Sequence, residues 1–136
     1  MDAPATVERT VELDAPTDVV WAALTEDELL SDWFGGPASL DPVPGGSGRF
    51  ETDDGTVRRA RVDEVDPGRR LSWRWWTDGD DDGPITAVTF ELIEGSTGTR
   101  LVVTERPLLL GTAWASAALG RGVARLQARA SLFCRV

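Results

Sequence analysis

Residues 111–136 (GTAWASAALGRGVARLQARASLFCRV) are the stretch around which the rest of the chain is organised. No proline interrupts them, and apolar side chains recur at spacings of three and four, which is typical of an amphipathic helix. The apolar stripe comprises Ala115, Leu119, Gly122, Val123, Leu126, Ala130 and Phe133. Arg121, Arg125 and Arg129 recur every fourth residue on the other side. The pattern predicts a long terminal helix with one apolar face that another part of the chain must cover.

The residues before this stretch have the pattern of strands. Apolar and polar side chains alternate, which predicts strands over residues 6–13, 49–52, 57–65, 71–77, 85–93 and 99–106. Tight turns such as Asp53-Asp54-Gly55 and Asp66-Pro67-Gly68 separate them. Because these connections are short, consecutive strands are expected to pair antiparallel.

Two short helices are predicted between the first two strands. Residues 14–17 begin one of them, with Pro16 in the first turn, where proline is tolerated. Thr25-Glu26-Asp27-Glu28 has the form of a capping box for the second, which ends near Trp33 and Phe34. The predicted fold class is therefore α+β: a curved antiparallel sheet of about six strands wrapped round a long C-terminal helix, with two short helices after the first strand.

Composition limits the class of protein. A chain of 136 residues, 41% of them hydrophobic, is expected to form one domain, residues 1–136. The net charge of −9 argues against nucleic acid as a partner, because phosphate binding needs a basic surface. No apolar run has the length of a membrane span, residues 1–4 lack the basic start of a secretory signal, and the single cysteine suits a reducing compartment. We expect a cytoplasmic monomer or homodimer without a membrane partner.

Missing residue types exclude several chemistries. The chain has no histidine, lysine or tyrosine. This excludes a Ser-His-Asp triad, a Cys-His pair, a lysine Schiff base and a His-ligated zinc site. Cys134 has no partner base in the sequence and is interpreted as structural. Any catalysis would rest on carboxylates, arginine, serine, threonine or the one cysteine, and neither a cofactor nor a metal is predicted.

Several short motifs, in order along the chain, resemble one family. They are Asp14-Ala15-Pro16, Val20-Trp21, Ala23-Leu24-Thr25, Trp33-Phe34, Gly45-Gly46, Val65-Asp66-Pro67, Arg70-Leu71 with Trp73 and Trp75, Val88-Thr89-Phe90 and Thr99-Arg100-Leu101. This series resembles the START-like (SRPBCC) superfamily, and more narrowly its branch named after the activator of the heat-shock-protein-90 ATPase. The resemblance implies a helix-grip fold with a cavity between the sheet and the long helix. Trp114 departs from the family pattern, since it lies off the apolar stripe.

A ligand-binding cavity is predicted on the inward face of the sheet. Aromatic rings there would give a large contact area for a planar or apolar molecule. The predicted lining is Trp33, Phe34, Phe50, Trp73, Trp75, Phe90, Leu101, Val103, Glu105, Gly122 and Leu126. The alternative is that the aromatic side chains simply fill the core. Trp76 is expected on the opposite face, because its neighbour Trp75 points inward.

Glu105 is the polar member of this predicted lining. Strand alternation places it inward, where it could serve as an acid, a base or a polar anchor. Arg58 or Arg59 is a candidate partner. The alternative, which the sequence alone favours, is a glutamate at the end of its strand that reaches solvent.

Two charged segments are candidate binding sites. Residues 78–85 (DGDDDGPI) match the first half of a calcium loop, but Thr89 holds the position of the closing glutamate, so a solvated acidic hairpin loop is favoured over calcium. The stripe of Arg121, Arg125 and Arg129 could dock a phosphate or an acidic partner. Pairing with the chain's own acids, or a solvated face, is the favoured interpretation.

Non-covalent binding of a small hydrophobic or aromatic molecule is the favoured function, with Glu105 or an arginine setting its orientation. One alternative is an enzyme of the polyketide cyclase or hydrolase kind, which would use a cavity carboxylate. Another is a protein-interaction module such as a chaperone cofactor, with a protein partner docked near Trp76 or Trp114.

Overall fold

The structure is a computed structural model that describes residues 6–80 and 83–109 of the 136-residue chain. In chain order the elements are β1 (Val7–Leu13), α1 (Thr17–Thr25), α2 (Asp27–Phe34), β2 (Ala38–Leu40), β3 (Ser47–Glu51), β4 (Val57–Asp66), β5 (Arg70–Thr77), β6 (Ile85–Glu94) and β7 (Thr99–Leu109). The helix predicted over residues 111–136 lies outside the described residues. So do Gly122 and Leu126 of the predicted cavity lining.

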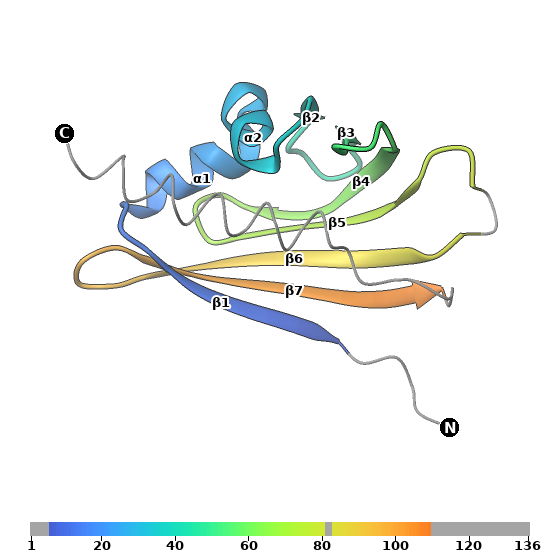
Figure 1. Cartoon of the computed structure of the whole chain (residues 1–136). Helices are drawn as coiled ribbons and strands as arrows, with labels where there is room; N and C mark the ends of the chain where they lie inside the picture. The colour runs from blue at the N-terminus through green and yellow to red at the C-terminus, as the bar shows by residue number, and fades with distance from the viewer. Residues whose placement is uncertain (1–5, 81–82, 110–136) are drawn as a thin grey trace.

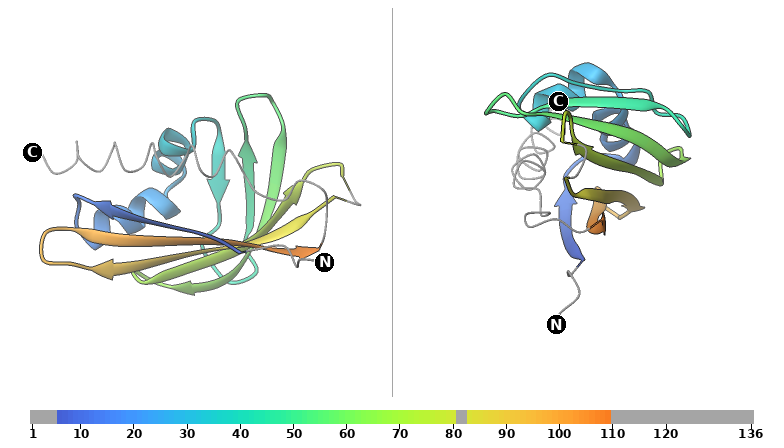
Figure 2. Two further views of the ribbon diagram at one scale, coloured as in Figure 1. Left: turned by 60° about the horizontal axis from the view of Figure 1, so that its bottom comes forward. Right: turned by 90° about the vertical axis from the view of Figure 1, so that its right-hand side faces the viewer.

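The seven strands form one antiparallel sheet, in which β2 to β7 follow one another as a meander and β1 pairs with β7. The strand order is β1-β7-β6-β5-β4-β3-β2. β1 and β2 therefore lie at opposite edges, and α1 and α2 connect them (Figure 1). The sheet is curved, as the two views in Figure 2 show. α1 packs against β6 and α2 against β2, so the helices join the core on one side of this α+β fold.

The two faces of the sheet differ in chemistry because side chains alternate along each strand. On β5, Leu71, Trp73 and Trp75 are buried, whereas Arg74 between them is exposed. The same alternation buries Val88, Phe90 and Leu92 on β6 and Leu101, Val103 and Glu105 on β7. We call the face that carries these buried residues the interior face and the opposite one the outer face.

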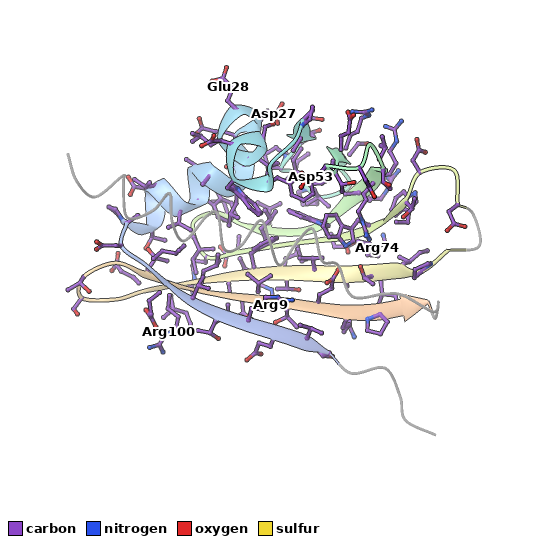
Figure 3. The ribbon with its side chains drawn as sticks, in the orientation of Figure 1. Arg9, Asp27, Glu28, Asp53, Arg74 and Arg100 are labelled. Atoms are coloured by element: carbon purple, nitrogen blue, oxygen red, sulfur yellow. The ribbon has the colours of Figure 1, made fainter. Side chains whose placement is uncertain are left out.

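Cross-strand ion pairs cover the outer face. Arg74 of β5 pairs with Asp63 of β4 at 3.0 Å, and Arg100 of β7 pairs with Glu12 of β1 at 2.6 Å. Both arginines are labelled in Figure 3. Exposed pairs of this kind contribute roughly 0–1 kcal/mol each. They identify the solvated face, while burial of the interior face supplies most of the stability of the fold.

The start of α2 differs from the sequence prediction. Glu26 is the N-cap residue, and no side-chain cap hydrogen bond forms there. Thr25 is instead the last residue of α1, and its hydroxyl donates to the Trp21 carbonyl at 2.8 Å. The predicted capping box is therefore wrong, because Thr25 bonds back into the preceding helix.

Two strands also differ from the prediction. β2 is a three-residue strand that pairs with β3 and was not predicted, because its short, turn-flanked sequence shows little alternation. β7 was predicted to end at residue 106 but continues to Leu109. Pro107 is tolerated because β1 pairs with β7 only as far as Glu105, and the β6–β7 register shifts beside it.

Candidate functional site

Six aromatic side chains meet on the interior face. They come from α2, β3, β5 and β6, and none is more than 3% exposed: Trp33, Phe34, Phe50, Trp73, Trp75 and Phe90. The Phe50 ring lies at the centre, with its centroid 5.2 Å from the Trp73 ring and 5.5 Å from the Trp75 ring. We call these six residues the aromatic cluster. These six side chains contact one another and form part of the core. A ligand would therefore lie against the cluster rather than between its members.

Two aliphatic members of the predicted lining flank this cluster on β7. Leu101 and Val103 are at most 1% exposed. Val103 lies opposite Phe90 in the β6–β7 register, and Leu101 lies opposite Leu92. The described part of the predicted lining therefore belongs to one continuous interior surface.

Glu105 is a buried carboxylate within β7. It is 4% exposed, and its Oε2 accepts hydrogen bonds from Trp75 Nε1 and Thr86 Oγ1, each at 3.2 Å. The structure buries Glu105, as strand alternation predicts. The solvent-exposed alternative is wrong, because β7 continues beyond this residue to Leu109 and keeps it within the sheet.

Arg58 is the interior arginine of β4. Its neighbours Arg59 and Arg61 are exposed, whereas Arg58 is half-buried, and its Cζ lies 4.2 Å from the centroid of the Trp75 ring. Burial lowers the pKa of Arg58 because it disfavours the charged form, and the charge of Glu105 opposes this effect. A guanidinium nevertheless keeps its charge in a protein. Of the two candidate partners, Arg58 is thus the one that faces the Glu105 charge.

Two buried nitrogen atoms of this site have no hydrogen-bond acceptor within residues 6–80 and 83–109. They are Arg58 Nε and Trp73 Nε1. The other two indoles of the aromatic cluster are paired, since Trp33 donates to the Ala23 carbonyl at 2.7 Å and Trp75 donates to Glu105. Buried polar groups are nearly always hydrogen-bonded, so two unpaired donors beside one aromatic cluster are an exception that needs an explanation.

Sequence reasoning missed two polar members of the site. One is Thr86, which is fully buried and lies opposite Trp75 in the β5–β6 register. The sequence contains a signal for its burial, because Thr86 lies on the same face of β6 as Val88 and is the polar residue among the otherwise apolar residues of that face. The other is the Trp73 indole N–H. Nothing in the sequence separates it from the paired indole of Trp75, because the difference arises from the acceptor that Glu105 provides.

The acidic loop lies apart from this site. Asp78 pairs with Arg59 at 3.6 Å, and Asp80, Gly83 and Ile85 line a small pocket of about 240 Å³ with the half-buried Trp76. Among the residues that the structure describes, no three His, Cys, Asp or Glu side chains come together as a metal site. Residues 81–82 are outside that description, so calcium binding stays a prediction. The arginine stripe of residues 121–129 and Trp114 also lie outside it.

An antiparallel sheet whose first strand pairs with its last, and whose edges two short helices connect, defines a START-like domain. The chain matches the family described as Activator of Hsp90 ATPase homolog 1-like protein over residues 14–127. It therefore belongs to that family, and the resemblance seen in the sequence is confirmed. Neither described helix has the length and apolar character that crossing a membrane requires.

Solved structures share the fold. Protein MLL2253 from Mesorhizobium loti has a TM-score of 0.82 at 24% identity, over 97% of this chain and 100% of that one. The HSP90 activator PFC0360w from Plasmodium falciparum has a TM-score of 0.66 at 21% identity, over 85% of this chain and 83% of that one.

A third structure is more similar in sequence. DynU16, a protein in the dynemicin biosynthetic locus, is 32% identical with a TM-score of 0.78, over 93% of this chain but 47% of that one. This chain thus spans about half the length of DynU16. No curated protein sequence matches the chain.

Proposed function

We propose that the protein binds a small hydrophobic or aromatic molecule non-covalently over the aromatic cluster. The observation that carries this proposal is the pair of unpaired donors, Arg58 Nε and Trp73 Nε1, beside that cluster. A buried donor without an acceptor costs about 1–3 kcal/mol. A ligand oxygen that accepts from either nitrogen would recover this cost, so the site gains more from a ligand than apolar contact alone would give.

The chemistry of the interior residues supports an aromatic ligand. Trp73 and Trp75 have ring centroids 5.9 Å apart, and Arg58 lies over the Trp75 ring. Aromatic faces of this size provide broad contact area, and a few placed polar groups fix orientation. A relative in a biosynthetic locus, DynU16, is consistent with a small-molecule ligand.

The experiment is a titration of the purified chain with a panel of apolar and aromatic compounds. Tryptophan emission and the melting temperature Tm are followed together. A ligand present at 100 times its Kd stabilises the folded protein by about 2.7 kcal/mol, so Tm should rise measurably. Trp76→Phe serves as the matched control, because Trp76 lies on the outer face and its loss should leave the response intact. A panel that moves neither signal at millimolar concentration would exclude the proposal.

A cyclase or hydrolase is a second candidate, favoured by one observation: Glu105 is a carboxylate on the interior face beside a hydroxyl, Thr86. Its two donors hold it in place, which suits a positioned acid or base as well as an anchor. Glu105→Gln separates the two functions. An enzyme would lose turnover while still binding ligand, whereas full turnover in Glu105→Gln would exclude Glu105 as the catalytic group.

A further inference from the structure

Within residues 6–80 and 83–109, the buried side-chain atoms without a hydrogen-bond partner are both donors. An indole and a guanidinium donate and cannot accept, and the two unpaired atoms are Trp73 Nε1 and Arg58 Nε. Glu105 Oε2 already accepts hydrogen bonds from Trp75 Nε1 and Thr86 Oγ1. An acceptor oxygen on the ligand would therefore satisfy one of the unpaired donors.

The charges of the site decide between a neutral and an anionic acceptor. Arg58 lies over the ring of Trp75, whose indole donates to Glu105, so the guanidinium and the carboxylate adjoin one side chain and their opposite charges offset one another. An anionic ligand would add a second negative charge to a mostly buried region, and such a charge is costly without its own partner. Arg9 belongs to the interior-face row of β1, where it lies opposite Val103, but it is exposed and its charge is screened by solvent. The balance favours a neutral acceptor.

The two donor side chains, Arg58 and Trp73, both lie next to the Trp75 ring. The Trp75 ring lies under Arg58 at 4.2 Å and 5.9 Å from the Trp73 ring, so both donors adjoin the same aromatic surface. Because Arg58 occupies one face of the Trp75 ring and the Trp73 ring is inclined at 61° to it, a planar molecule would pack beside these rings and present an oxygen at its edge to either nitrogen. A ketone-type carbonyl has this geometry, because its oxygen lies in the plane of the ring that carries it.

We propose that the ligand is a neutral aromatic molecule with at least one ring carbonyl or aryl ketone oxygen, which accepts a hydrogen bond from Trp73 Nε1 or Arg58 Nε. This inference rests on the proposed function and specifies its ligand class.

Three probes of nearly equal size test it on the full chain by isothermal titration calorimetry. They are 2-acetylnaphthalene, which is a neutral ketone; 2-ethylnaphthalene, which lacks the acceptor; and 2-naphthoate, which is an anion. The ketone is expected to bind at least about tenfold more tightly than either of the others, since one otherwise unpaired donor gains a partner. Equal affinity of the ketone and the ethyl compound would overturn the inference and leave the proposed function standing. Tighter binding of the naphthoate would overturn it in favour of an anion site.

Variants identify the donor. Trp73→Phe keeps an aromatic ring and removes one N–H, while Arg58→Met with Glu105→Gln removes the other without leaving a lone buried charge. At least one of these proteins should lose the tenfold preference for the ketone over 2-ethylnaphthalene. Trp76→Phe should keep the preference. A preference that survives both interior changes would overturn the inference, and failure of all three probes to bind the wild-type chain would overturn the inference and the proposed function together.

Discussion

The Thr86–Glu105 hydrogen bond offers a quantitative test of the polar part of the site. Thr86→Val keeps the shape of the side chain and removes the hydroxyl that donates to Glu105 Oε2 at 3.2 Å. A hydrogen bond to a charged group contributes about 1.5–3 kcal/mol. Thr86 is fully buried, so the new methyl group returns up to about 0.8 kcal/mol of apolar burial. The expected net loss in the free energy of unfolding is about 1–2 kcal/mol.

The same substitution in a Glu105→Gln background isolates the pair. A neutral acceptor supports a hydrogen bond of about 0.5–1.5 kcal/mol. Thr86→Val should therefore cost about 1 kcal/mol less in that background, which is a coupling energy that a double-mutant cycle can measure. Thr104→Val is a suitable control, because Thr104 is a half-buried threonine of β7 next to Glu105 in sequence and on the opposite face.

Urea denaturation of the four proteins of the cycle gives the numbers, with the slope m checked for constancy. A loss below about 0.3 kcal/mol for Thr86→Val, or an equal loss in both backgrounds, would refute a charged, hydrogen-bonded Glu105 in the interior.

Two further predictions concern the turns of the fold. Gly98→Ala should lower the free energy of unfolding by about 1–3 kcal/mol, because a Cβ at Gly98 would overlap the Leu13 carbonyl oxygen and backbone cannot move aside cheaply; the exposed Ser96→Ala in the same hairpin should change it by less than about 0.5 kcal/mol, and equal effects would contradict the steric argument. The pKa of Asp54 is lowered from 3.8 to about 2, chiefly because the Thr52 hydroxyl donates to its carboxylate. Its contribution to stability should be complete above pH 3.8 and disappear as pH falls through about 2. An NMR titration in which Thr52→Val leaves the Asp54 pKa near 2 would contradict the assignment.

Much of the sheet could be predicted from the sequence, because each strand is half-buried and its alternation is visible. Trp73 and Trp75 point inward and Arg74 outward, as their spacing requires. β2 escaped prediction because three residues are too few to show a period. The capping box failed for a different reason, since Thr25 can bond either forward or back and the preceding helix supplied the acceptor.

The sequence predicted which residues lie on the interior face better than it predicted their hydrogen-bond partners. The aromatic cluster and Glu105 follow from alternation alone. Which arginine approaches Glu105, and which indole remains without an acceptor, depend on contacts between β4, β5 and β7 that no local pattern encodes. The terminal helix, with Gly122 and Leu126, stays a prediction because residues 110–136 lie outside the described structure.

The central claim is that Trp73 Nε1 or Arg58 Nε donates a hydrogen bond to the carbonyl oxygen of a bound aromatic ligand. The six tryptophans of the chain should give six indole N–H resonances in a ¹H–¹⁵N spectrum, and Trp73→Phe identifies the one that matters. On titration with 2-acetylnaphthalene, the Trp73 indole proton or the Arg58 Nε proton should shift downfield until the site is saturated. The Trp33 indole, which is already bonded to Ala23, should show only the smaller ring-current changes. If the Trp73 indole proton and the Arg58 Nε proton both stay in place while calorimetry shows the ketone bound, the claim is contradicted.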